Sequence, residues 1–201
     1  MRRRAHGVKP HRAFDPRQVG ELECIAWVTY YRREWPSFLR AAIGLTRHTF
    51  GLSRLSTLRG AWLVLRANQL WAPLPDNDPA GARRAMVRFY RLVTQAHGER
   101  LDPEQAAELE VEWWRVHRAH QRGGSPDDEE RLIEALTALY AYVYTVPASD
   151  VRVAAEQRAL AMRHSDRWVA EGRRLDSPLI EHERAALVRS YAGLLAAVHR
   201  S

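Results

Sequence analysis

The sequence predicts an all-α protein, a single-domain bundle of about seven helices that are mostly antiparallel neighbours with short connections. From about residue 18 onward, apolar residues recur at spacings of three and four, which is the period of an amphipathic helix. No stretch shows the period-two alternation, bounded by turns, that is typical of a strand. Proline and glycine interrupt the pattern at short intervals, and short connections favour antiparallel packing of consecutive helices.

Length and composition favour one folded domain. The chain has 201 residues, of which 46% are hydrophobic and 27% are charged, as in ordinary globular domains. We expect a basic, mobile N-terminal tail over residues 1–17 and a single helical domain over residues 18–201. The tail has six basic residues and one acidic residue, which is five of the seven net positive charges. Because this excess lies in a tail and not on a folded surface, binding to nucleic acid is not expected.

The sequence also bears on the compartment of the protein. No apolar run approaches the roughly 20 residues that span a bilayer, and the basic start is not followed by the apolar stretch of a secretory signal. Cys24 is the only cysteine, so no internal disulfide can form, which fits a reducing compartment. We therefore expect a cytoplasmic protein without a membrane partner.

Glycine and proline delimit the first two helices. The first is predicted over residues 18–48 with a bend at Pro36, because an interior proline removes a backbone hydrogen bond and crowds the preceding turn. Gly51 ends this helix. The second is predicted over residues 54–71 and cannot continue into the prolines of WAPLPDNDP.

The third helix has the clearest start signal in the chain. Asp78 followed by Pro79 is typical of an N-cap with proline at the first helical position. This helix is predicted to reach His97 and to end at Gly98. Similar signals predict four further helices, over residues 103–121, 127–145, 149–171 and 177–199.

Four helices have an apolar stripe without charged residues, and these helices are expected to be structural. The second helix is an example. Its stripe consists of Leu55, Leu58, Trp62 and Leu65. We expect these four side chains to be buried.

The other three helices have charged or titratable residues inside the apolar stripe. They are Glu21 and Arg32 in the first helix, Glu110, His117 and His120 in the fourth, and Arg158 in the sixth. A buried charge without a partner costs several kcal/mol. These groups are therefore expected to pair, to contact water, to bind a ligand or not to be buried at all. The last alternative applies where a stripe turns outward at a helix end, and Glu21, one turn into its helix, is the main example. One interpretation is a purely structural network in which Arg158 and Arg32 meet Glu110 and Glu21.

The leading functional hypothesis is a protein that binds a small organic anion in a polar pocket between the first, fourth and sixth helices. Arg32 and Arg158 would each hold a carboxylate or phosphate through two hydrogen bonds. The remaining ligand-binding candidates are Tyr31, Trp35, Gln69, Trp113 and Met162. If the ligand is a substrate, His117 and Glu110 are the catalytic candidates, with His117 as acid or base.

A metal-dependent oxidase or hydrolase is the first alternative. His117 and His120 are three residues apart, so their rings can converge on one ion from one helix face. Glu21 from another helix would complete a two-histidine, one-carboxylate site for Fe or Zn.

The second alternative is a non-enzymatic protein–protein interaction module whose buried ion pairs are only structural. Two apolar pairs lie outside the predicted core stripes, Leu70 with Trp71 and Tyr142 with Tyr144. They could form an exposed patch for a homodimer or for a helix of a partner. Alternatively, because some helices of such a bundle bury two faces, the same residues could pack inside it.

Overall fold

Eight helices make up the described part of the chain. The structure is a computed structural model that describes residues 12–123 and 126–200. The helices are α1 (Pro16–Tyr31), α2 (Trp35–Phe50), α3 (Arg54–Trp71), α4 (Pro79–His97), α5 (Pro103–Gly123), α6 (Pro126–Tyr144), α7 (Ala148–Ala170) and α8 (Pro178–Arg200). No strand occurs within these described ranges, so the predicted all-α class is confirmed.

The predicted helix over residues 18–48 is in fact two helices, so the predicted count of about seven is one too low. After α1, Arg33 has a left-handed backbone with φ 61°, which ends an α-helix. The Glu34 amide then donates to the Thr29 carbonyl at 2.8 Å. Pro36 lies in the first turn of α2, where proline is well tolerated because its missing N–H would have no partner. We expected Pro36 to bend a helix, whereas it helps to begin one.

Most other helix ends are the predicted ones. The Asp78 carboxylate caps α4 by accepting the Gly81 amide at 2.7 Å, and Pro79 is the first residue of this helix. Gly51 and Gly98 end α2 and α4 with left-handed φ values of 57° and 62°. These conformations cost glycine little because it has no Cβ.

α1 begins inside the segment that we assigned to the tail. The Asp15 carboxylate caps it by accepting the Arg17 amide at 2.9 Å. Phe14 is buried in the core, and its ring contacts Tyr144 and Tyr191 edge-on. The larger part of the predicted tail, residues 1–11, lies outside the described residues.

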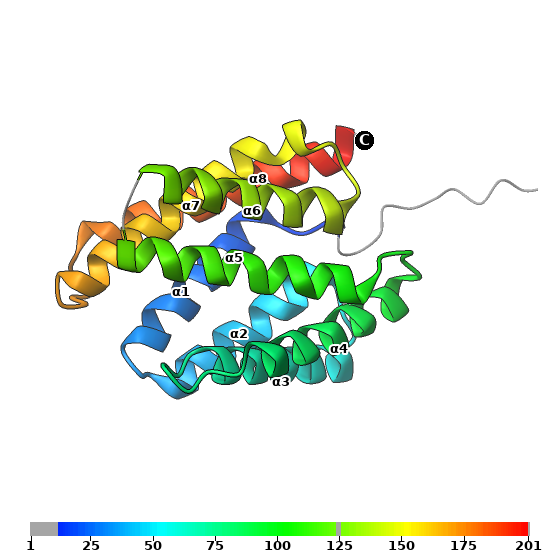
Figure 1. Ribbon diagram of the computed structural model, residues 1–201, viewed down its shortest axis with the longest axis horizontal. Helices are drawn as coiled ribbons and strands as arrows, with labels where there is room; N and C mark the ends of the chain where they lie inside the picture. Colours follow the sequence, from blue (N-terminus) through cyan, green and yellow to red (C-terminus); the bar gives the residue numbers. More distant parts are fainter. Residues whose placement is uncertain (1–11, 124–125, 201) are drawn as a thin grey trace, which may run out of the picture.

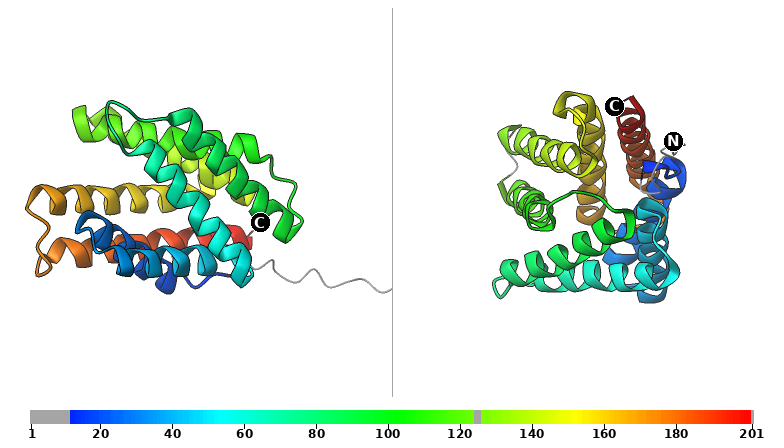
Figure 2. Two further views of the ribbon diagram at one scale, coloured as in Figure 1. Left: turned by 90° about the horizontal axis from the view of Figure 1, so that it is seen from below. Right: turned by 90° about the vertical axis from the view of Figure 1, so that its right-hand side faces the viewer.

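Consecutive helices pack side by side, and α8 returns to pack against α1. Figure 1 shows α6, α7 and α8 on one side of the molecule, α2, α3 and α4 on the other, and α1 and α5 between them. The two views of Figure 2 show the same division. We call α2, α3 and α4 the lower layer. Within the described residues, no helix combines the length and apolar character that crossing a membrane requires.

α3 packs through small side chains. Its buried residues are Thr57, Gly60, Ala61 and Ala67. A Cβ at Gly60 would lie 3.3 Å from Thr46 of α2 and 3.4 Å from Phe89 of α4. The absence of a side chain at this position therefore lets α3 approach both neighbours closely.

Burial of the small residues turns the large apolar residues of α3 outward. Leu55, Leu58 and Trp62 are 79%, 54% and 60% exposed, so our prediction that they are buried is wrong. For the two apolar pairs outside the predicted stripes, the structure supports packing inside the bundle over an exposed patch. Tyr144 is buried, and the other members of that patch, Leu70, Trp71 and Tyr142, are partly buried against the cluster between α3, α4 and α5.

Candidate functional site

Arg158 of α7 is paired in the interior with a carboxylate that the sequence analysis did not single out. Its two terminal nitrogens donate to the two carboxylate oxygens of Glu23 of α1, at 3.0 and 2.5 Å. The Tyr191 hydroxyl of α8 donates to the same carboxylate at 2.5 Å. The guanidinium carbon also lies 5.9 and 5.6 Å from the ring centroids of Trp27 and Trp113, within reach of a cation–π attraction. A bidentate clamp on a ligand would therefore require the Glu23 pair to break.

Burial and the ion pair with Glu23 act in opposite directions on the pKa of Arg158. Burial lowers the pKa of Arg158, but the neighbouring Glu23 carboxylate raises it, and the net result is a pKa well above the ordinary value. Burial and the charge of Glu23 raise the pKa of Tyr191 well above its ordinary value. Arg158 therefore keeps its charge and Tyr191 keeps its proton at neutral pH.

Glu110 of α5 is also enclosed by hydrogen bonds. The Tyr90 hydroxyl of α4 donates to it at 2.6 Å and the Trp113 indole donates at 3.0 Å. Burial raises the pKa of Glu110, and these two hydrogen bonds lower it by less. Glu110 links α4 to α5, and no ion pair joins it to Arg158 among the described contacts.

His117 has a partner of its own on α7. Its Nε2 lies 3.1 Å from Oδ2 of Asp166, and the Gln121 amide donates to the other oxygen of this carboxylate at 2.7 Å. The His117 side chain is 18% exposed. A carboxylate thus orients the histidine, but the two catalytic candidates, His117 and Glu110, belong to separate hydrogen-bonded groups.

The predicted metal ligands do not form one group. Glu21 pairs with Arg17 on α1 at 3.5 Å, whereas His117 contacts Asp166. The Nδ1 atom of His120 is buried without a hydrogen-bond partner among the described residues. In the described ranges, no three His, Cys, Asp or Glu side chains are grouped so that they could hold a metal ion.

The other predicted ligand-binding residues are dispersed. Arg32 pairs with Glu34 at 2.6 Å just beyond the end of α1. It lies nine residues after Glu23, or roughly 13 Å along a helix axis, and so does not share the site of Arg158. Of the remaining candidates, Trp35 and Gln69 are exposed, Tyr31 is half-buried and Met162 is fully buried.

Glu183 of α8 is a second buried acid that the sequence analysis missed. Its side chain is fully buried, and neither carboxylate oxygen has a hydrogen bond of good geometry among the described residues. Burial and, to a smaller extent, the charge of Glu23 raise the pKa of Glu183 to about 8, although Cys24 and Ser165 lie close enough to lower it. Glu183 is four residues before the buried Leu187, a spacing that places both on one helix face and could have revealed it.

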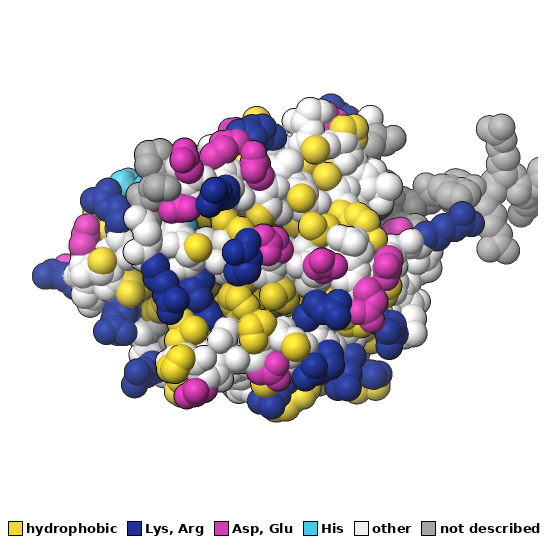
Figure 3. Space-filling view, viewed as in Figure 1, with side chains coloured by type: hydrophobic (Ala, Val, Ile, Leu, Met, Phe, Trp, Pro, Cys, Tyr) yellow, Lys and Arg dark blue, Asp and Glu magenta, His cyan; other side chains and the backbone are white. Residues whose placement is uncertain are grey.

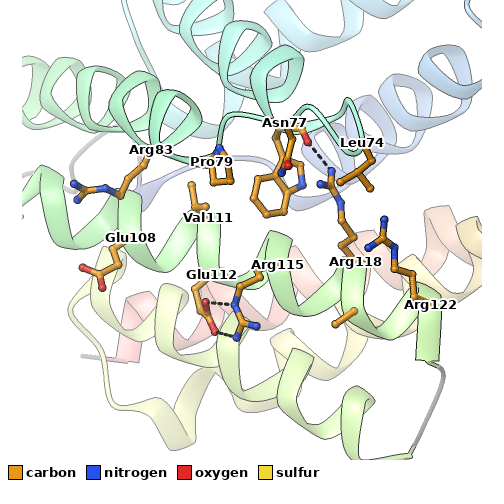
Figure 4. Close-up of a pocket in the computed structure, with 12 residues that line it drawn as sticks. Leu74, Asn77, Pro79, Arg83, Glu108, Val111, Glu112, Arg115, Arg118 and Arg122 are labelled. Atoms are coloured by element: carbon orange, nitrogen blue, oxygen red, sulfur yellow. Dashed lines mark hydrogen bonds and ion pairs between the residues drawn. The ribbon is translucent and has the colours of Figure 1, made fainter.

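An open groove lies between α5 and the segment that joins α3 to α4. Its volume is about 470 Å³. Its charged lining consists of four arginines and two glutamates, Arg83, Arg115, Arg118, Arg122, Glu108 and Glu112, and its apolar lining includes Trp71, Leu74, Pro79 and Val111. Figure 4 shows the α5 side chains along one wall and Leu74 and Asn77 on the other. On this side of the molecule, Figure 3 shows hydrophobic surface between groups of basic side chains.

Arg118 is fixed in this groove by Trp71. Its guanidinium carbon lies 4.2 Å from the centroid of the indole, and its Nη2 donates to the Trp71 carbonyl at 2.8 Å. Its Nη1 is buried and has no acceptor among the described residues. Burial lowers the pKa of Arg118, and the nearby charge of Arg122 lowers it further. An anion at this point would supply the missing acceptor and reduce the repulsion between the two cations.

The other arginines of the groove have carboxylate partners. Arg115 makes two hydrogen bonds to Glu112, at 2.8 and 2.6 Å, which appear as dashed lines in Figure 4. Arg83 contacts Glu104 at 3.4 Å. Arg118 and Arg122 are therefore the cations of the groove that an anionic ligand could neutralise.

Comparison with known proteins adds no family to this geometry. No family model, no curated protein and no solved structure shows a significant match to the chain. Function therefore has to be inferred from the residues themselves.

Proposed function

We propose that the protein binds a small organic anion in the groove between α5 and the 72–78 segment. The observation that carries this proposal is the guanidinium of Arg118. Trp71 holds it in place, while its Nη1 lacks an acceptor among residues 12–123 and 126–200. A buried donor without an acceptor is costly, and a charge-assisted hydrogen bond to an anion removes that cost. Arg122 supplies a second positive charge next to it.

The lining of the groove favours a particular class of ligand. A carboxylate and a phosphate both match the planar donors of a guanidinium. The apolar side chains of Trp71, Leu74 and Val111 offer a surface for the rest of the ligand. Four arginines against two glutamates favour a ligand with net negative charge.

The proposed ligand is of the class expected from the sequence, but the proposed site is a different one. Arg118 and Arg122 replace Arg158 and Arg32, because Arg158 already donates to both oxygens of Glu23. We propose no catalytic role for His117 or Glu110, since neither lines the groove. We also do not propose a metal-dependent oxidase or hydrolase, because the ligands it would need lie apart.

Calorimetric titration with a panel of small phosphates and carboxylates tests the proposal. Arg118→Gln is expected to weaken the binding of a panel member about ten-fold or more, as loss of a hydrogen bond to a charged group would. Arg115→Gln is the matched control, since it removes the same charge from the same groove but takes away a guanidinium that Glu112 already occupies. Arg115→Gln is expected to change the affinity for the same ligand by no more than about three-fold.

Two results would contradict the proposal. Equal losses in both variants would mean that the ligand responds only to the net charge of the groove. Absence of binding by every phosphate and carboxylate at millimolar concentration would remove the site altogether. Binding of only one of the two anion types would keep the site and identify the ligand class.

A further inference from the structure

The outer face of α3 is an apolar surface that does not line the groove. We call it the α3 face and define it by Leu55, Leu58 and Trp62. These residues follow the spacing i, i+3 and i+7, so they share one side of the helix, and each is more than half exposed. Leu55 at 79% exposed has almost no covering neighbour, which makes the α3 face a protruding surface and not a cleft.

Three arginines surround these apolar side chains. Arg54, Arg59 and Arg66 are all exposed on α3, and none of them makes an ion pair or a side-chain hydrogen bond among the described residues. The α3 face therefore combines aliphatic and indole groups with positive charges that no group in the described part of the chain neutralises.

The positive charge extends through the whole lower layer. α2, α3 and α4 contain nine arginines and no acidic residue, and only Asp76 and Asp78 lie in the connection between α3 and α4. Residues 35–98 contain nine arginines and two aspartates. Their net charge of +7 equals the net charge of the entire chain. In the rest of the sequence, including the basic tail, basic and acidic residues are equal in number. A positive excess therefore also lies on the folded part of the chain, contrary to the expectation that it lies only in the tail. Basic side chains are accordingly numerous along the lower edge of Figure 3.

We infer that the α3 face binds the surface of an anionic lipid bilayer. Leucine and tryptophan side chains on one side of a helix insert at the boundary between headgroups and acyl chains, where tryptophan is especially favourable. Arginines beside them contact lipid phosphates, and a basic layer is attracted to an anionic leaflet over about one Debye length. The helix lies on the membrane and does not cross it. This inference departs from the expectation, drawn from the lack of a long apolar run, that the protein has no membrane partner.

Other occupants fit the α3 face less well. A second copy of the chain would bring arginines against arginines in a two-fold interface. Nucleic acid would satisfy Arg54, Arg59 and Arg66 but would leave Leu55 and Leu58 against a polar backbone. An acidic helix of another protein prefers a groove with walls, whereas these side chains protrude.

Vesicle flotation with the full chain tests the inference. Vesicles of phosphatidylcholine alone are compared with vesicles that contain about one third phosphatidylglycerol, at low and at high salt. We expect binding only to the anionic vesicles, weaker at high salt. The double variant Leu58→Gln/Trp62→Gln should weaken it about ten-fold or more, because two inserted side chains are lost. Arg59→Glu/Arg66→Glu should weaken it by at least the same factor.

Matched controls lie on other helices. Val153→Gln removes a side chain of α7 that is 63% exposed, and Arg131→Glu reverses a charge on α6 whose side chain is 70% exposed. Neither should change vesicle binding more than about two-fold. All these positions are exposed, so circular dichroism should show every variant folded.

Several outcomes would overturn the inference. One is binding that survives Leu58→Gln/Trp62→Gln but is lost when Arg2, Arg3 and Arg4 become glutamine, since the N-terminal residues would then be responsible. Another is failure to bind anionic vesicles, whether or not the chain binds nucleic acid or an acidic peptide instead. A third is a dimer that dissociates in the Trp62→Gln variant, which would assign the α3 face to a second copy.

Discussion

At Arg158, three groups that are each costly to bury share one set of contacts. The guanidinium, the Glu23 carboxylate and the Tyr191 hydroxyl come from α7, α1 and α8. Removal of one of the two charged members leaves the other charge in the interior without compensation, which is far more costly than replacement of both charges. The stability effect of this network therefore depends on which members are changed together.

Arg158→Met is expected to destabilise the protein by about 3–5 kcal/mol, because it leaves the Glu23 carboxylate buried and unpaired. The double variant Glu23→Gln/Arg158→Met should recover most of this loss, since the amide oxygen of glutamine still accepts from Tyr191. Urea unfolding of both variants and the wild type measures the difference. A double variant no more stable than Arg158→Met would show that the unpaired charge is not the cause.

Glu183 should make stability depend on pH. Its pKa is raised from 4.5 to about 8 by burial and by Glu23, so the folded state binds this proton more tightly than the unfolded state. The stabilisation is complete below about pH 4.5 and is lost as pH rises through about 8. Glu183→Gln keeps the size of the side chain and cannot ionise.

We therefore expect the free energy of unfolding of Glu183→Gln to exceed that of the wild type by an amount that grows between about pH 5 and about pH 9. Urea unfolding over this range gives the comparison. Glu110 also has a raised pKa, but it is present in both proteins and cancels in the difference. Parallel pH profiles would mean that Glu183 is not the titrating group.

At the scale of the helices, glycines set how closely two of them approach. A Cβ at Gly20 of α1 would lie 2.8 Å from the Val188 nitrogen and 2.9 Å from its Cγ2 on α8. At Gly193 of α8, the nearest atom to a new Cβ is the Ala154 Cβ at 3.6 Å, which is an ordinary contact. The two helical glycines thus differ in what surrounds them and not in their own chemistry.

Gly20→Ala should destabilise the protein by about 2 kcal/mol, since overpacking against backbone outweighs the better helix propensity of alanine. Gly193→Ala should be neutral or stabilising by up to about 1 kcal/mol. Thermal unfolding of the pair provides the measurement. Equal effects of the two substitutions would argue against the close contact between α1 and α8.

At the scale of the whole molecule, the two larger apolar clusters are connected. One cluster is built from α1 and α5–α8, and a second from α3, α4 and α5. The partly buried side chains of Trp113 and Val143 pack against both clusters. The lower layer therefore shares its core contacts with the rest of the bundle.

We expect the chain to unfold in one cooperative step for this reason. Tryptophan fluorescence and far-ultraviolet circular dichroism should give coincident urea transitions. Two separated transitions, with the first sensitive to Phe89→Ala in the lower layer, would show that α2, α3 and α4 unfold on their own.

The sequence by itself determined the class of fold and nearly all the helix ends. Asp78 with Pro79, Gly51 and Gly98 mark helix ends through bonds that reach only a few residues along the chain. Such signals are complete within the local sequence. The missed break between α1 and α2, at Arg33, depends on a left-handed residue that is not glycine, and such residues carry weak sequence signals.

Only the tertiary structure decided which face of each helix is buried and which charges meet. On α3 the small residues face α2 and α4 while Leu55, Leu58 and Trp62 face outward. Arg158 meets Glu23, which is 135 positions away in sequence, and Arg118 is fixed by Trp71 across the groove. The physical reason is that hydrophobic burial has no direction of its own. The side chains that leave water are those that a neighbouring helix happens to cover, and that depends on how closely the two backbones can approach.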